Sequence, residues 1–172
     1  RIRERRKSGN PFTPGEALVT CWLISRAVQT LHRFAVHGFL NPQEIFLEPW
    51  EDGPISWYPK IAHAGLRASL RLSSMALEGL DQEACLFAAP EFTSQETLTE
   101  ATDSYGMGAL LYSMLTLRPP TGCFVRPTKL HPGLPESLDR FVLQVLDEDP
   151  LERDGSSTAF SNLLKEQAGP GM

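Results

Sequence analysis

The sequence has few cysteines and no pattern that would use them. Its three cysteines, Cys21, Cys85 and Cys123, are odd in number and widely spaced, and no C-x-x-C or Cys/His cluster accompanies them. Structural zinc sites need grouped Cys and His ligands, and disulfide frameworks need paired cysteines. We therefore expect neither a zinc site nor a disulfide framework. Reduced thiols favour a cytoplasmic location.

Long hydrophobic runs are also missing. The longest apolar stretch, residues 107–117, is shorter than the roughly 20 residues that a membrane-spanning helix needs, and no signal peptide opens the chain. With 172 residues, 41% hydrophobic and 22% charged, the composition is typical of one globular domain. We expect a single domain over residues 1–172. Because the sequence does not begin with Met, we also expect it to be part of a longer protein.

An excess of positive charge is absent as well. Sixteen Lys and Arg against twenty-one Asp and Glu give a net charge of −5, which argues against a nucleic-acid partner. The opening RIRERRK is an exception, because five basic residues and one Glu give it +4 and leave −9 for the remainder. We interpret residues 1–12 as a basic N-terminal segment with a solvated helix face or a frayed end. Contact of this segment with phosphate or a membrane surface is the minor alternative.

Hydrophobic periodicity predicts a mainly helical domain. Apolar residues recur at three- and four-residue spacing over residues 14–34, directly after a Thr-Pro-x-Glu sequence typical of a helix start. A second helix is predicted over 103–117; it is apolar on nearly every side, which indicates a helix at the centre of the domain. Two further amphipathic helices are predicted near residues 138–146 and 160–164.

The segments between these helices contain turn and strand signals. EIFLE and ISWYPKI flank the turn sequence EDGP, which predicts a small β-hairpin. Residues 67–102 mix alternating and polar pieces, so we expect irregular structure there. Residues 168–172 are predicted to form a frayed tail.

Five sequence patterns stand in the same order as in the C-terminal lobe of protein kinases. LHRFAVHGFLNPQEIFL resembles the end of a long helix and the catalytic loop, H-R-D-L-x-x-x-x-N. KIAHAGL resembles the strand that leads into D-F-G, and AAPE supplies A-P-E. ATDSYGMGALLY resembles the central buried helix, and LDEDPLERDGS the D-P-x-x-R-P-S segment that closes the lobe. The sequence thus resembles a kinase-like C-lobe, and its overall residue pattern is closer to that of bacterial Ser/Thr kinase-like proteins than to that of animal ones.

The resemblance implies a fold class and a set of structural positions. The fold is expected to be mainly α, a protein-kinase-like C-lobe with one or two short β-hairpins and no N-lobe. Glu91 and Arg153 match a buried ion pair that ties the activation segment to the last helices. Asp103 matches an Asp that accepts backbone hydrogen bonds from the catalytic loop, and His37 matches a core residue beside it.

The same resemblance places altered residues at the catalytic positions. Phe39 replaces the catalytic Asp, and Asn41 replaces the Lys two residues later. Gly38 replaces the loop Arg. Glu44 and His63 replace the magnesium-binding Asn and the Asp of D-F-G. An apolar ring cannot accept a proton, and a neutral imidazole is a poor ligand for magnesium. We therefore expect a pseudokinase that is not an enzyme, with no catalytic residue, cofactor or metal.

Two features of the nucleotide cleft complete this interpretation. No part of the sequence resembles the glycine-rich loop of an N-lobe, and Phe46 stands where a smaller residue lies under adenine in kinases. Phe39 and Phe46 are expected to fill the cleft. Glu44 and His63 stay open as a pair, because they could bind a metal or a polar ligand if they face each other. Ser73 and Ser74 have no G-x-S-x-G context and predict no hydrolase.

The expected function is that of a catalytically inactive pseudokinase C-lobe. Such a lobe would act as a protein-protein interaction or regulatory module in signalling, with a protein partner. That partner would be a kinase, or an N-lobe or another segment of the parent protein. Two alternatives remain: a nucleotide-binding sensor, and an atypical nucleotide-dependent transferase that uses a remodelled cleft.

Overall fold

The structure is a computed structural model of the chain. This structure describes residues 2–9, 12–64, 81–94, 97–121, 124–154, 158–159, 161–162 and 165. Several expectations lie outside these residues: Gly65 of the D-F-G counterpart, Ser73, Ser74, Cys123, the tail 168–172 and most of the helix expected over 160–164.

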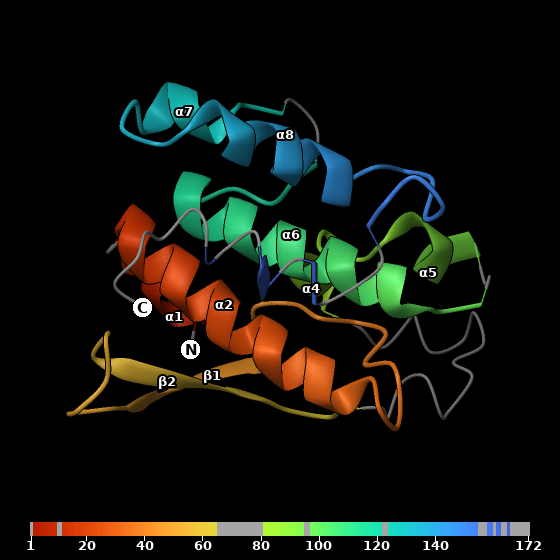
Figure 1. The fold of residues 1–172 in the computed structure, drawn as a ribbon, viewed down its shortest axis with the longest axis horizontal. Helices are drawn as coiled ribbons and strands as arrows, with labels where there is room; N and C mark the ends of the chain where they lie inside the picture. The colour runs from red at the N-terminus through yellow and green to blue at the C-terminus, as the bar shows by residue number, and fades with distance from the viewer. Residues whose placement is uncertain are drawn as a thin grey trace.

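The helices stack in layers above one hairpin (Figure 1). Helix α2 (Pro14–Leu31) packs against α6 (Glu100–Thr116), and the short α7 (Pro127–Leu130) and α8 (Glu136–Val145) pack against α6 in turn. The hairpin packs against α2. The expected mainly α architecture with a short hairpin is confirmed among the described residues. Its main core lies between α2, α6 and α8.

Helix α6 is the central element, as its sequence predicts. Every residue from Ala101 to Thr116 is buried. The helix begins at Glu100, three residues before the expected start at Asp103. Thr99 caps it, since its side chain accepts a hydrogen bond from the Ala101 N–H. A helix surrounded by protein needs apolar or small residues on all sides, which explains its weak amphipathic pattern.

Helix α2 begins where its capping sequence predicts. The Thr13 hydroxyl accepts a hydrogen bond from the Glu16 N–H, and the Glu16 carboxylate accepts one from the Thr13 N–H at 2.8 Å. The helix ends at Leu31, three residues before the expected end at position 34.

Strands β1 (Ile45–Pro49) and β2 (Trp57–Ile61) form the predicted antiparallel hairpin, with Phe46 opposite Lys60 and Glu48 opposite Tyr58. Side chains alternate between the two faces of a strand. One face packs on the core and carries Ile45, Leu47, Trp57 and Ile61. The other, which we call the outer face of the hairpin, carries Phe46, Glu48, Tyr58 and Lys60.

Two short helices correct the expectation of irregular structure for residues 81–94; residues 67–80 and 95–96 of that expectation lie outside the described residues. Helix α4 (Gln82–Cys85) is capped by Asp81, whose side chain accepts a hydrogen bond from the Glu83 N–H. Helix α5 (Pro90–Ser94) follows at once. Helices of one turn are too short for a hydrophobic period to show, so the periodicity of the sequence could not reveal them.

The basic N-terminal segment is also more firmly packed than its sequence predicts. It forms helix α1 (Ile2–Lys7), whose first residue, Ile2, is fully buried. The Arg5 guanidinium lies 4.4 Å from the ring centroids of both Phe12 and Trp57, and it pairs with Glu16 at 3.1 Å. The expectation of a frayed end is therefore wrong for these residues, because burial and ion pairs hold α1 on the lobe, whereas Glu4 and Lys7 form a solvated face of this helix.

Candidate functional site

The loop between α2 and β1 is held by the first turn of α6. The Asp103 carboxylate is fully buried, and it accepts hydrogen bonds from the His37 N–H at 2.8 Å and the Gly38 N–H at 2.7 Å. Gly38 has a φ of 83°, a left-handed conformation that favours glycine. Asp103 thus fixes the start of this loop, in the position that the resemblance implied.

His32 contacts the same carboxylate. Its Nε2 lies 2.8 Å from the Asp103 Oδ2, and its Nδ1 lies 3.4 Å from the Glu100 Oε2. Burial alone would lower the pKa of His32, but the hydrogen bond and charge of Asp103, together with Glu100, raise it. His32 was not among the predicted site residues, although its position at the end of a helix just before the loop was a signal in the sequence.

His37 joins the loop to the end of β2. Its Nε2 lies 2.9 Å from the carbonyl oxygen of Ala62, and its Nδ1 accepts a hydrogen bond from the Phe39 N–H at 3.3 Å. Since Nδ1 accepts, Nε2 donates to Ala62. The ring is fully buried, and its two hydrogen bonds connect the loop to the end of β2.

Phe39 is packed into a small apolar cluster. It is 3% exposed and stacks on Phe92 of α5, with ring centroids 4.6 Å apart and planes 18° apart. Ala84 of α4 completes the cluster. Phe46 lies instead on the outer face of the hairpin. The two rings that were expected to fill one cleft are thus placed in different surroundings.

Asn41 shapes the loop from within. Its side chain is 1% exposed, donates a hydrogen bond to the Phe39 carbonyl oxygen at 3.0 Å and accepts one from the Gln43 N–H at 2.9 Å. Both bonds are made to the loop's own backbone. The Asn41 side chain therefore stabilises the loop rather than reaching outward as a Lys would.

Glu44 and His63, the pair left open by the sequence, are in contact. The His63 Nδ1 lies 2.6 Å from the Glu44 Oε2. The Glu44 side chain is 6% exposed and that of His63 59%, so the pair has a buried and an accessible member. His63 has a φ of 52°. Over the described part of the chain, no group of three His, Cys, Asp or Glu residues is placed to hold a metal ion.

Glu91 and Arg153 form a bidentate ion pair in the interior. The two guanidinium nitrogens donate to the two Glu91 carboxylate oxygens at 2.8 and 3.0 Å, and the side chains are 2% or less exposed. Burial raises the pKa of Glu91, but the hydrogen bonds and charge of Arg153 outweigh it and hold that pKa below its usual value. The pair joins α5 to the segment after α8.

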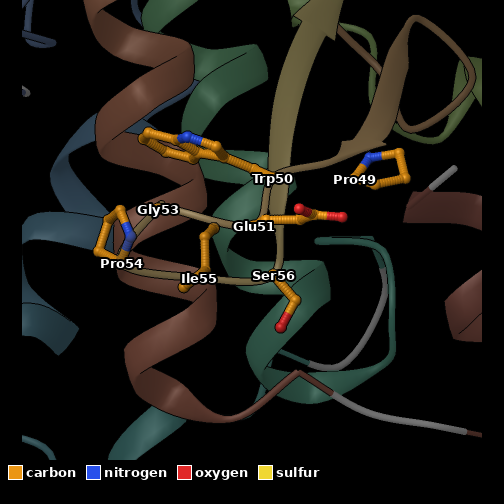
Figure 2. A pocket seen from close by; sticks show the side chains of 7 residues that line it. All are labelled: Pro49, Trp50, Glu51, Gly53, Pro54, Ile55 and Ser56. Atoms are coloured by element: carbon orange, nitrogen blue, oxygen red, sulfur yellow. The ribbon is translucent and has the colours of Figure 1, made fainter.

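A hollow in the surface lies elsewhere. It has a volume of about 290 Å³ at the tip of the hairpin (Figure 2), and its lining residues are Pro49, Trp50, Glu51, Gly53, Pro54, Ile55 and Ser56. The last residue of β1 and the turn that follows it form this hollow. Glu44 and His63 lie at the opposite ends of the two strands, so this hollow is separate from the loop residues described above.

The structure also bears on location. No helix of the described residues is both long enough and apolar enough to cross a membrane. A cytoplasmic location stays a prediction.

Comparisons with known proteins point to protein kinases. No sequence model of a protein family matches the chain. A probable serine/threonine-protein kinase of Streptomyces coelicolor is 26% identical over 172 residues, which is 87% of this chain and 24% of that protein. The probable serine/threonine-protein kinase zyg-1 of Caenorhabditis elegans is 29% identical over 134 residues, or 74% of this chain and 17% of that protein. The chain thus spans a quarter or less of these relatives.

Solved structures agree on the fold. The kinase domain of PknI from Mycobacterium tuberculosis matches with a TM-score of 0.67 and 20% identity, over 91% of this chain and 57% of that domain. A Rad53 kinase domain solved with SCD2 and AMPPNP matches with a TM-score of 0.66 and 19% identity, over 94% and 62%. The chain therefore has the fold of part of a protein kinase domain.

These similarities correct one expectation. The sequence led us to expect that the chain is not an enzyme, on the basis of the residues at the catalytic positions. Its relatives and its structural neighbours are protein kinases, which are enzymes. The inference from five altered residues to the whole protein was wrong, because residue identities at a few positions do not define the class of a protein.

Proposed function

We propose that this chain, a member of the protein kinase-like superfamily, acts as a regulatory or protein-interaction lobe. Its partner would be a kinase, an N-lobe or another segment of the parent protein. By the resemblance, Phe39 stands where kinases have the Asp that orients the substrate hydroxyl, and Glu44 and His63 stand where an Asn and an Asp hold magnesium.

The observation that carries this proposal is the packing of Phe39. At the position of the catalytic Asp, the ring is buried against Phe92 and Ala84, so this part of the loop contributes to the core. The supporting framework is intact at the same time, since Asp103 holds the loop and Glu91 pairs with Arg153. A retained scaffold beside a remodelled loop supports a role in binding.

The outer face of the hairpin is the surface that fits a partner best. The alternation of the strands turns its four side chains away from the core, and Tyr58 is 42% exposed there. Lys60 and Glu48 form an ion pair at 2.6 Å beside it, with both side chains more than half exposed. Interaction surfaces are enriched in aromatic residues and have a polar rim, which an exposed tyrosine beside a solvated ion pair matches.

Proximity labelling with matched variants tests this role. The parent protein carrying Tyr58→Asp should lose its main labelled partner, because a charge on this face opposes an apolar contact. Leu130→Asp on α7, which is 47% exposed, is the control and should keep that partner. Purified components then establish direct binding. The proposal fails if both variants retain the same partner with equal affinity.

The contact between Glu44 and His63 favours a second candidate. By the resemblance, the two residues stand at the magnesium-binding positions of kinases, and the exposed imidazole beside a buried carboxylate would offer a nucleotide or its metal ion two ligands. The chain would then be a nucleotide sensor or an atypical nucleotide-dependent transferase. Turnover of labelled ATP, abolished in Glu44→Ala and unaffected in Glu48→Ala, would support this candidate. No turnover in either the wild type or the variants would count against a transferase.

A further inference from the structure

Helices α1 and α4 are far apart in sequence but are joined by charge. The Arg3 guanidinium lies 2.9 Å from the Asp81 carboxylate and 2.9 Å from that of Glu83, and the Lys7 ammonium lies 3.6 Å from Glu83. Asp81 and Glu83 stand at the start of α4. The basic face of one helix thus contacts the acidic first turn of another.

The catalytic-loop counterpart takes part in the same contact. The Gln43 side-chain amide donates a hydrogen bond to the Asp81 carboxylate at 2.7 Å. The hydrogen bond from the Glu83 N–H, followed by those from Gln43 and Arg3, lowers the pKa of Asp81. No water-sized space remains where Arg3, Glu83 and Gln43 meet, and the neighbouring Phe87 is 1% exposed. The contact is closely packed.

Helix α4 in turn covers Phe39. Ala84, one residue after Glu83, is 4% exposed and lies in the cluster of Phe39 and Phe92. Since α4 has only four residues, its own hydrogen bonds cannot hold it in place. Its position depends on its neighbours, which are this apolar cluster, α1, and the packing of Phe87 against Tyr105 and Ala109 of α6 directly after it.

We infer that α1 and the first turn of α4 form an electrostatic latch, consisting of Arg3, Lys7, Asp81 and Glu83, which holds α4 over Phe39. When the latch opens, α4 leaves the loop and uncovers this part of the lobe. The ion pairs are partly exposed, with side-chain exposures between 23% and 59%, so salt or a competing charged partner can reach them. The inference goes beyond the proposed function and does not depend on the hairpin face.

Hydrogen exchange measured by mass spectrometry tests the latch. Arg3→Ala should raise the exchange rate of a peptide covering residues 81–89 about two- to fivefold, while peptides from α6 keep their protection. Added salt should raise the wild-type rate in the same peptide. Lys60→Ala, which removes a comparable ion pair with Glu48 on the hairpin, is the control and should leave this peptide unchanged.

A double-mutant cycle with Glu83→Ala shows whether the two helices act together. Asp81 is left intact because it caps α4. The latch predicts that Arg3→Ala has a smaller effect on residues 81–89 once Glu83 is replaced. Unchanged exchange in Arg3→Ala, or fully additive effects, would overturn it. If Arg3→Ala also raises exchange in α6, the lobe is unfolding as a whole. Glu83→Ala then provides the test in its place. The latch predicts that this variant raises exchange in residues 81–89 and not in α6.

Discussion

The Arg153 side chain uses all of its N–H donors inside the protein. Beyond the two bonds to Glu91, it donates to the carbonyl oxygens of Asp147, Ala101 and Glu148 at 2.7–3.2 Å. Its guanidinium also lies 4.9 Å from the ring centroid of Tyr105. A single residue therefore joins α5, α6 and the chain after α8.

Replacing Arg153 should destabilise the lobe strongly. Arg153→Ala leaves the Glu91 carboxylate buried and unpaired, which typically costs about 3–5 kcal/mol. Chemical denaturation gives the free energy of unfolding. Arg153→Lys keeps the charge but loses the fork of donors, so an intermediate loss is expected. An unchanged free energy in Arg153→Ala would contradict the assignment of this pair as a main support of the fold.

His32 should make stability depend on pH. Its pKa in the folded lobe is raised above the ordinary 6.5 by Asp103 and Glu100, against the effect of burial. The protonated ring therefore stabilises the fold fully below about pH 6.5, and this contribution is lost as the pH rises through the raised value. The difference in unfolding free energy between wild type and His32→Gln should shrink from pH 5.5 to pH 9. A constant difference would show that charge is not involved.

At the residue scale, motif order in the sequence indicated which side chains belong together. It placed Glu91 with Arg153 and Asp103 with the loop, because a kinase-like order of patterns fixes neighbours that are distant in the chain. It left the contact between Glu44 and His63 open, because sequence order does not determine whether side chains from two different loops come into contact. It could not indicate that Phe39 stacks on Phe92, because the packing of two rings depends on the path of both backbones.

At the scale of elements, the approach of α6 to the loop depends on a glycine. A Cβ atom on Gly106 would lie 2.8 Å from the Leu40 Cβ and 3.1 Å from the Leu40 carbonyl oxygen. Neither of these Leu40 atoms is the end of a flexible side chain, so neither can move aside easily. The loop therefore lies directly against the helix, which brings its N–H groups within reach of Asp103.

Gly106→Ala should destabilise the lobe although alanine favours helices. The gain in helix propensity is about 1 kcal/mol, whereas forcing an extra methyl into a packed contact typically costs about 1–3 kcal/mol. Gly15→Ala in α2 is a matched control, because no atom lies within 4 Å of its added Cβ. Thermal unfolding should show a lower melting temperature for Gly106→Ala alone. Equal or higher stability in both variants would mean that the loop can shift.

Long elements could be predicted from the sequence, and short ones could not. Helices α2 and α6 and the hairpin have enough residues for a period, a cap or a turn to appear. Helices α4, α5 and α7 have four or five residues each, and contacts with other elements hold them. Helix α1 was taken for a solvated segment because its charges stand out, while the burial of Ile2 and the pairing of Arg3 require partners elsewhere in the chain.

At the scale of the whole molecule, the layers separate two surfaces of the lobe. The far side of α6 is covered by α7 and α8, and the outer face of the hairpin lies on the opposite side of the stack (Figure 1). Between them, α4 and α5 pack against the loop at Phe39. This arrangement keeps the framework of a kinase lobe and uses the catalytic-loop position for packing, which is the central claim of our account.

A thermal-shift titration with ATP, with and without magnesium, tests this claim most directly. A ligand at a hundredfold excess over its dissociation constant stabilises by about 2.7 kcal/mol, which should raise the melting temperature of a domain of this size by roughly 5–10 °C. Our account predicts a change below about 1 °C for this chain under both conditions. A magnesium-dependent rise of several degrees would contradict it and would show that this chain binds ATP together with magnesium.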